Sequence, residues 1–319
     1  MTSEQRKIWV LGATGFIGNA LLRHLSEDAG NSLHLLLHKR MPLHLLETYN
    51  TFAGSLSGFD PFWMERYPPD LVFHLARHAG GNKLARQFAA YSGERANRRF
   101  ASILSGLAKP PVVVYVSGSL VYGNRLSTSP AAEDADPAPA AYARWYYRNE
   151  IPWLEARRKG LLDVRFARPG WIIGPASWFR AFFWMHYLET GKVPCYGDGK
   201  QLMSLVHLDD GVALMDALSK QGRPDQDLNI FSGPAITHHT FVEILADLLG
   251  AEIDVLPASA VRRKFGHTTA EALLSSIPMT TLHPMLYENY TMQFHNPEVI
   301  LSDIVRLLKN EQGVFAKTP

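Results

Sequence analysis

Three glycines near the amino terminus have the spacing of a nucleotide-binding turn. Gly12, Gly15 and Gly18 follow the apolar run Lys7 to Leu11 and open a segment with helical periodicity. In such a turn the first glycine permits a tight bend, the second lets the backbone approach a pyrophosphate, and the third lets the helix pack closely on the strand. The N–H groups that begin the helix would then face the phosphates. An ordinary strand-to-helix turn is the alternative, but the strand before it and the helix after it favour dinucleotide binding.

The residues after the second predicted strand bear on the choice of nicotinamide cofactor. A fold that prefers NAD usually has Asp or Glu there, about 20 residues past the glycines. This chain has His38, Lys39 and Arg40 instead, and no carboxylate occurs between Gly30 and Leu46. An arginine could clamp a 2′-phosphate, which a carboxylate would repel. We therefore expect NADP(H), although NAD is not excluded, because a solvated turn would have the same composition.

Segments further along the chain carry a resemblance to a known family. The run GATGFIG at 12–18 is similar to the opening of the extended short-chain dehydrogenase/reductases, the NAD(P)-dependent epimerase/dehydratase group. Further matching segments follow in the family's order, and they are FHLA at 73–76, VYG at 121–123, RPG at 168–170, GP at 174–175, GDG at 197–199, VHLDD at 206–210, NI at 229–230 and SG at 232–233. Together they are far more specific than any one of them. The resemblance implies a Rossmann-like cofactor domain and a smaller C-terminal substrate lobe.

The resemblance also implies which residues line the cofactor. They belong to the glycine turn, to the ends of the second and fourth strands, to the helix of the catalytic tyrosine and to the RPG segment. In this sequence they are Gly12, Thr14, Gly15, Phe16, Ile17, Gly18, His38, Lys39, Arg40, Leu75, Ala76, Arg77, Tyr142, Pro169 and Gly170.

Tyr142 is the residue that the resemblance assigns to the chemistry. The family uses a tyrosine as proton donor or acceptor and a lysine four residues later, on the same helix face. That lysine lowers the pKa of the tyrosine and binds the nicotinamide ribose. Tyr142 has the tyrosine's place after a Pro/Ala-rich loop, and Glu150 matches another common family position, but Tyr146 stands where the lysine would be. Arg144 and Arg148 are poorly placed to replace it, and we expect them to be solvated or interface residues.

A second departure concerns the hydroxyl that would bind the substrate. The family has Ser or Thr four residues before the tyrosine of its VYG segment, and this chain has Gly118 there. Ser117 and Ser119 flank this glycine, and either could take the role, although neighbouring side chains of a strand point to opposite faces. The predicted catalytic residues are therefore Tyr142, Ser117 and Ser119. The alternative for Tyr142 is a packing role.

A third departure concerns the substrate. Nucleotide-sugar members commonly carry Arg-Asp just before the VHLDD segment and Asn after RPG, whereas this chain has Met203-Ser204 and Trp171. Without a bidentate phosphate ligand, a nucleoside-diphosphate sugar is disfavoured. An aromatic cluster in the expected lobe either suits an apolar ligand or packs the core, and it comprises Trp178, Phe179, Phe182, Phe183 and Trp184.

The elements that must position these residues are those of a doubly wound α/β fold. Strands are predicted at 7–11, 32–37, 51–53, 70–76, 112–117 and 162–167. Their continuous apolar runs are typical of parallel strands covered on both faces, and the helical segments between them predict βαβ units. We expect an NAD(P)-binding domain at 1–175 and a mostly α+β substrate lobe at 176–319, with 200–235 returning to pack on the first domain. Within the lobe, 191–201 reads as loop and 239–249 as helix.

Composition excludes several classes of protein. The chain has 319 residues, of which 46% are hydrophobic and 19% charged, so it is expected to be ordered. With 32 basic and 30 acidic residues, neither nucleic acid nor an anionic membrane is an expected partner. The apolar runs fall short of the roughly 20 residues of a membrane span. One cysteine, Cys195, cannot form an intrachain disulfide, and without a signal-peptide pattern a cytoplasmic location is expected.

We expect no metal site. The resemblance implies that His207, Asp209 and Asp210 tie the C-terminal helix to the sheet. His238 and His239 are adjacent in sequence and therefore point in different directions.

Two functions from different classes remain open. The first is an atypical NADP-dependent oxidoreductase or epimerase/dehydratase-like enzyme for a small carbonyl or alcohol substrate that is not a nucleotide sugar. The second is a dinucleotide-binding protein of the same fold without redox turnover. The missing lysine favours the second, whereas the glycine turn and Tyr142 favour the first, which we prefer. The resemblance further implies a homodimer that pairs through the helices at 95–107 and 142–157.

Overall fold

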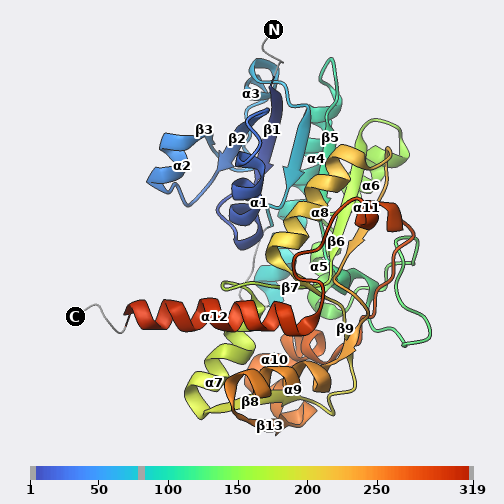
Figure 1. Ribbon diagram of the computed structural model, residues 1–319. Coiled ribbons are helices and arrows are strands. Elements are labelled where there is room, and N and C mark those ends of the chain that lie inside the picture. The colour runs from blue at the N-terminus through green and yellow to red at the C-terminus, as the bar shows by residue number, and fades with distance from the viewer. Residues whose placement is uncertain (1–4, 78–82, 316–319) are drawn as a thin grey trace. The chain divides into compact units, whose positions relative to one another are not determined.

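A computed structural model describes residues 5–77 and 83–315. The chain forms two compact units, and each is assembled from three segments. The first unit comprises the segments 1–118, 143–168 and 212–228, and the second comprises 119–142, 169–211 and 229–319. Figure 1 labels the helices and strands of both units.

A seven-stranded sheet is the framework for the expected cofactor site, and its order is β11-β6-β5-β4-β1-β2-β3. The bounds are β1 (Arg6–Leu11), β2 (Asn31–Leu37), β3 (Asn50–Ala53), β4 (Leu71–His74), β5 (Val112–Val116), β6 (Asp163–Pro169) and β11 (Leu228–Ile230). Every pairing from β3 to β6 is parallel. The strand order runs in opposite directions from β1, with β2 and β3 on one side and β4 to β6 on the other. This is the doubly wound arrangement, and the predicted fold class is confirmed.

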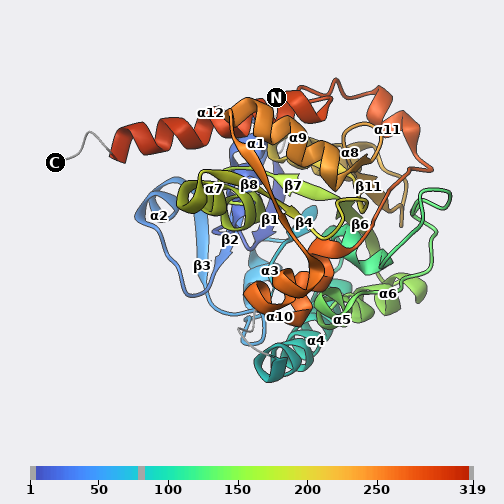
Figure 2. The same ribbon diagram turned by 90° about the horizontal axis from the view of Figure 1, so that it is seen from below.

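The strands of the first unit are buried on both faces, as their apolar runs predicted. Ile8, Trp9, Val10 and Leu11 are all inaccessible to solvent. Because side chains alternate along a strand, Trp9 and Leu11 share one face, where they join a core cluster that includes Trp153. On this face α4 (Lys83–Ser105) packs against α6 (Ile151–Arg158), and Figure 2 shows the two helices side by side.

Further helices connect the strands. They are α1 (Phe16–Ser26), α2 (Leu43–Thr48) and α3 (Phe62–Arg66) within the first unit, and α5 (Ala141–Tyr147) and α8 (Leu208–Gln221), which contain residues of both units. Within residues 5–77 and 83–315, no helix combines the length and the apolar character needed to cross a bilayer.

The second unit is built from short strand pairs and helices. The strand pairs are β7 (Trp171–Ile173) with β10 (Leu205–His207), β8 (Lys192–Tyr196) with β13 (Glu252–Leu256), and β9 (Leu202–Met203) with β12 (Ile236–Thr237). The helical elements are the 3₁₀ turn η1 (Ser119–Tyr122), the π-helix η2 (Arg180–Trp184), α7 (Met185–Thr190), α9 (His238–Leu249), α10 (Ala258–Leu274), α11 (Pro284–Glu288) and α12 (Pro297–Phe315). α9 packs against β8 and α12.

The prediction of a loop at 191–201 is wrong for Lys192–Tyr196, which form β8. Pro194 and the flanking glycines Gly191 and Gly197 are typical of loops, so the local sequence pattern does not indicate a strand here. The strand exists because it pairs in parallel with β13, which lies far along the chain, and because Val193 is buried in the core of this unit.

The aromatic cluster of the second unit is core packing. Phe179, Phe183 and Trp184 are buried, and Trp178 and Phe182 pack against the same cluster. The rings of Phe179 and Phe183 stack at 5.9 Å, and Phe183 meets Phe241 of α9 edge-on at 5.0 Å. Their burial explains these residues without a ligand, so they carry no argument for an apolar substrate.

Candidate functional site

The glycine turn after β1 has a backbone geometry that other residues could not adopt. Gly12 has a φ of +94°, and a Cβ atom there would lie 2.8 Å from the backbone nitrogen of Ala76. A Cβ atom at Gly18 would lie 2.2 Å from the carbonyl oxygen of Gly12. Contacts this short do not occur between real Cβ atoms and backbone, so both positions require glycine. The turn after β1 thereby packs directly against the segment after β4, where the Leu75 N–H donates to the Leu11 carbonyl at 2.8 Å.

Gly15 and the start of α1 form a surface suited to an anion. Gly15 is the exposed N-cap of the helix, no side chain caps this terminus, and the first turn contains no acidic residue. The N–H groups and the positive end of the helix dipole are therefore not neutralised by a carboxylate of this helix. A Cβ atom at Gly15 would come 3.1 Å from the Gly12 carbonyl oxygen. Thr14, Phe16 and Ile17 are half-buried around it. The turn fits the pyrophosphate of a dinucleotide.

The basic residues expected near the adenosine ribose follow β2 directly. β2 ends at Leu37, and the side chains of His38, Lys39 and Arg40 are all exposed. β2 neighbours β1 in the sheet. The three side chains are therefore accessible at the carboxyl end of the strand that a Rossmann fold uses for the adenosine ribose.

The resemblance predicts Arg77 at the cofactor site from its place after β4. The structure shows which groups its side chain contacts. Its guanidinium donates to the carbonyl oxygen of Val116 at 3.3 Å and to that of Ser117. The guanidinium carbon lies 5.5 Å from the ring centre of Tyr146 on α5. No local sequence signal joins these residues, because they come from β4, β5 and α5. The arginine therefore stands beside the position at which the lysine is missing.

A buried polar network lies behind Ser117. The Ser117 hydroxyl donates to Glu150, which is almost fully buried. Burial raises the pKa of Glu150 above its ordinary value, and the charge of Arg168, the Ser117 hydrogen bond and the charge of Arg77 only partly oppose this. Arg168 lies 3.8 Å from Glu150 and 3.0 Å from Asp227, which also accepts from Arg157 at 2.5 Å. The hydroxyl proton of Ser117 is thus directed at Glu150 rather than at a substrate.

The remaining predicted catalytic residues belong to the second unit. Ser119 is buried and opens the turn η1, and Tyr142 is half-buried near the start of α5. Tyr142 and Tyr146 are one helical turn apart and so lie on the same helix face. Arg148 is engaged with α4, where it pairs with Glu94 and its guanidinium carbon lies 4.0 Å from the ring centre of Tyr91.

The positions that carry the substrate phosphate ligand in nucleotide-sugar enzymes are packed with other groups. Met203 belongs to the buried core, and the carbonyl oxygen of Ser204 would lie 2.2 Å from a Cβ atom at Gly170. The ring of Trp171 lies 4.6 Å from that of Trp178. Gly170 therefore allows the backbone of Ser204 to approach closely, and Pro169 is buried beside it. The residues at 169–171 and 203–204 include no cationic side chain.

Asp210 and His238 of the second unit are buried and accept hydrogen bonds from other parts of this unit. Asp210 is fully buried and accepts from the Tyr290 hydroxyl at 2.7 Å and from two backbone N–H groups that precede α12. His238 accepts from the Tyr196 N–H at 3.0 Å, and burial lowers the pKa of its imidazole to about 4. Over the described ranges, 5–77 and 83–315, no group of three or more His, Cys, Asp or Glu side chains could hold a metal ion.

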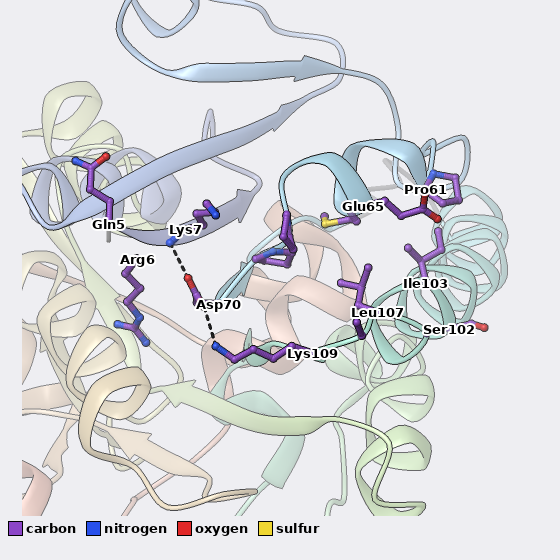
Figure 3. A pocket seen from close by; sticks show the side chains of 15 residues that line it. Gln5, Arg6, Lys7, Pro61, Glu65, Asp70, Ser102, Ile103, Leu107 and Lys109 are labelled. Atoms are coloured by element: carbon purple, nitrogen blue, oxygen red, sulfur yellow. Dashed lines mark hydrogen bonds and ion pairs between the residues drawn. The ribbon is translucent and has the colours of Figure 1, made fainter. Parts of the chain in front are cut away.

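A hollow of about 990 Å³ lies at the opposite end of the strands (Figure 3). Its lining includes Arg6 and Lys7 at the start of β1, Asp70 just before β4, and Lys109 before β5. Asp70 accepts from the Lys7 N–H at 3.0 Å and from the Lys109 ammonium at 3.1 Å. None of the predicted site residues lines this hollow.

Comparison with known proteins identifies the family of the chain. The sequence model of the NAD dependent epimerase/dehydratase family matches residues 8–230. The chain belongs to this family. As a member of the epimerase/dehydratase family it has an NAD(P)-binding fold, which agrees with the geometry of the glycine turn.

Curated relatives include two dTDP-glucose 4,6-dehydratases. The protein from Streptomyces griseus is 30% identical over 260 residues, which are 76% of this chain and 78% of the relative. The protein from Streptomyces antibioticus is 29% identical over 163 residues, or 50% of this chain. That second match spans 48% of the relative, about half its length.

Solved structures show the same fold. A human epimerase family protein, SDR39U1, solved with NADPH, has a TM-score of 0.76 at 19% identity, covering 94% of this chain and 99% of the human chain. A dTDP-glucose 4,6-dehydratase from Streptomyces venezuelae, solved with NAD, has a TM-score of 0.76 at 20% identity, covering 97% and 98%. Epimerase/dehydratase folds therefore occur with either nucleotide.

Proposed function

We propose that this protein is an NADP-dependent enzyme that oxidises, reduces or isomerises a small carbonyl or alcohol substrate. The observation that carries this proposal is the glycine turn, in which Gly12 and Gly18 are sterically required and the start of α1 lacks an acidic cap. These features bind and orient a pyrophosphate. A bound nicotinamide would supply hydride transfer at its C4 atom.

Tyr142 is the proposed proton-transfer or hydrogen-bonding residue, with Ser119 as its hydroxyl partner. Ser117 is less suited, because its proton is already donated to Glu150. Tyr146 cannot carry a positive charge, so it cannot lower the pKa of Tyr142 as a lysine would. Tyr142 therefore acts as a neutral donor that polarises a substrate carbonyl, a role that needs no ionisation.

The proposed substrate is not a nucleotide sugar. The dTDP-glucose dehydratases among the relatives act on such a sugar by their names, but this chain has buried Met203 and Ser204 just before its VHLDD segment. A thioether and a hydroxyl cannot form the bidentate, charged contact that an arginine gives to phosphate. A smaller, uncharged carbonyl compound fits this chemistry better.

NADP is the proposed cofactor, because the exposed side chains of Lys39 and Arg40 follow β2 and no carboxylate stands there. A calorimetric titration with NADP and NAD tests this choice. We expect tighter binding of NADP. Equal affinities, or tighter binding of NAD, would show that the basic pair is only a solvated turn.

A homodimer is also proposed. Leu84, Phe88 and Tyr91 are large hydrophobic residues that are 76%, 77% and 45% exposed on α4. Their spacing of four and three residues places them on one helix face, and exposed apolar stripes of this kind mark association surfaces. Light scattering at micromolar concentration is expected to give twice the monomer mass, and Phe88→Glu is expected to halve it. A monomeric wild-type protein would contradict the proposal.

The alternative function is dinucleotide binding without redox turnover. It is favoured by Gly118 at the position of the substrate-binding hydroxyl and by the engagement of Ser117 with Glu150. The deciding experiment follows NADPH consumption, and product formation by mass spectrometry because an isomerisation consumes no net cofactor, with a panel of small aldehydes and ketones and with dTDP-glucose as the comparison. Turnover of an uncharged carbonyl supports the enzyme. Tight cofactor binding with no turnover of any panel member supports the alternative.

A further inference from the structure

Arg77 lies at the carboxyl end of the sheet, and its charge acts on the buried carboxyl of Glu150 and lowers the pKa of that group. Its contacts are the carbonyl oxygens of Val116 and Ser117 and the ring of Tyr146. Among residues 5–77 and 83–315, no carboxylate forms an ion pair with it. Two other arginines of the first unit differ in this respect, since Arg168 pairs with Asp227 and Arg148 with Glu94.

Three neighbouring groups fix the position of the Arg77 guanidinium. Two carbonyl oxygens hold the guanidinium at the end of β5, and an aromatic face lies 5.5 Å from its carbon. A guanidinium has five N–H donors, and the hydrogen bonds to Val116 and Ser117 use one nitrogen, Nη2. The remaining donors can serve an oxygen-rich ligand at the same edge.

The sheet order indicates which part of a dinucleotide would meet this group. A Rossmann fold binds its ligand across the point where the strand order reverses, with the pyrophosphate at the first helix and the adenosine ribose toward β2. Here the reversal lies at β1, so the second nucleoside must extend over β4 and β5. Arg77 is tied to the end of β5, two strand spacings or roughly 10 Å from β1. It therefore lies beyond the pyrophosphate, on the side of the second nucleoside.

We propose that Arg77 binds the hydroxyl groups of the nicotinamide ribose, which is the contact that a lysine at position 146 would make. This inference rests on the proposed cofactor-binding function and specifies one contact of that site. The arginine reaches the ribose from β4 rather than from α5, and the Tyr146 ring fills the space from which a lysine would have reached it.

Three ligands of increasing length test this contact by calorimetry. They are 2′-phospho-ADP, 2′-phospho-ADP-ribose and NADP, or the same series without the 2′-phosphate if NAD binds more tightly. 2′-Phospho-ADP lacks the nicotinamide ribose, whereas 2′-phospho-ADP-ribose contains this ribose without the nicotinamide. Loss of a charge-assisted hydrogen bond in Arg77→Leu is expected to weaken the two longer ligands by about 10- to 100-fold. The shortest ligand is expected to bind within about twofold of wild type.

Control variants make the result specific. Arg148→Leu removes another guanidinium that faces a tyrosine ring but has a carboxylate partner, and it is expected to change none of the three affinities. Arg77→Gln keeps a hydrogen-bond donor toward β5 but removes the charge. It replaces Arg77→Leu in the titrations if Arg77→Leu does not fold. Adding Tyr146→Lys to Arg77→Leu is expected to restore much of the lost affinity, because the cation then returns on α5.

Two results would overturn the inference while leaving the proposed function intact. If Arg77→Leu weakens all three ligands equally, the arginine contacts the pyrophosphate or supports the fold. If it weakens none of them, the arginine does not touch the cofactor. A wild-type protein that binds none of the three ligands would overturn the proposed function and this inference together.

Discussion

The charged side chains at the two ends of the parallel sheet in the first unit have different kinds of partner. At the amino ends of the strands, Asp70 accepts from the Lys7 N–H and from Lys109. Burial pushes the pKa of Asp70 upward, but these two partners outweigh it and leave the pKa below its ordinary value. At the carboxyl ends, Arg77 donates to the neutral carbonyl oxygens of Val116 and Ser117 and lies against the ring of Tyr146, and the start of α1 has no acidic cap.

The difference shows that size alone does not locate a binding site. The amino end has a hollow of about 990 Å³, yet its acidic group already has partners within the protein. The carboxyl end has cationic and N–H groups that an anionic, hydroxyl-rich ligand would complete.

Tyr142→Phe is expected to lower turnover by about 10²- to 10⁴-fold, because a positioned proton donor contributes about that much to a rate. The affinity for the cofactor, measured by calorimetry, is expected to change little. Asp70→Asn at the amino end is the control and is expected to leave turnover unchanged. Undiminished turnover in Tyr142→Phe would make this tyrosine a packing residue and move the chemistry to the serines.

Gly15→Val is expected to abolish measurable dinucleotide binding, because the new side chain occupies the surface that the pyrophosphate approaches. The backbone of Gly15, with φ of −78° and ψ of 167°, is accessible to valine, so the protein is expected to fold. Gly106→Ala at the amino end is the matched control, since its Cβ atom would make an ordinary contact of 3.4 Å. Circular dichroism and calorimetry of both variants distinguish lost binding from lost structure. Normal binding in Gly15→Val would remove the basis of the cofactor assignment.

Arg40→Leu is expected to weaken NADP binding by about tenfold or more while NAD binding stays the same, because a guanidinium forms charge-assisted bonds to a 2′-phosphate. Lys109→Leu is the control at the amino end. An equal loss for both nucleotides would mean that Arg40 acts on the fold rather than on the phosphate.

Glu150→Gln is expected to gain stability relative to wild type as the pH rises. The raised pKa of Glu150 means that its folded form favours the protonated state. Its stabilising contribution is therefore complete at low pH and is lost as the pH rises through the folded-state pKa. Urea denaturation over a pH series measures the difference in free energy of unfolding, which we expect to be about 1–3 kcal/mol for this buried group. A difference that is constant with pH would show that folding does not raise the pKa of Glu150.

Asp70→Asn is expected to show the opposite pH dependence and a smaller effect. The pKa of Asp70 is lowered in the folded state, so its contribution is present at neutral pH and is lost as the pH falls through the folded-state pKa. Because Asp70 and Lys109 are 39% and 85% exposed, solvent screening limits the contribution to about 0.5 kcal/mol. The same denaturation series measures it, and a slope of the same sign as that of Glu150→Gln would contradict the contrast.

Local sequence patterns predicted the framework of the site. Continuous apolar runs predicted β1, β2 and β5 to within a residue or two, because a buried parallel strand is apolar on both faces. The glycine spacing predicted the turn, because the positive φ of Gly12 and the close contact of Gly18 follow from backbone sterics. These features depend on neighbours in sequence.

Features that depend on distant neighbours could not be predicted in this way. β8 is a strand because of β13, and the hydroxyl of Ser117 is engaged because Glu150 lies beside it. The position of Arg77 over Tyr146 joins two elements whose proximity only the folded sheet provides. The catalytic roles of Tyr142 and Ser119, and the domain boundary at residue 175, stay predictions.

The first unit is assembled from three separate segments of the chain, and these segments are synthesised at different times. Arg157 and Arg168 lie in the middle segment, whereas their partner Asp227 lies in the last, at 212–228. During translation both guanidinium groups emerge before the carboxylate that neutralises them. Pairings between such distant segments are slow to form, because the intervening chain must first be closed into a loop. The sheet can therefore complete its folding only after residue 227 has left the ribosome, and a nascent chain that stops earlier has two arginines without the carboxylate that holds them in the native unit.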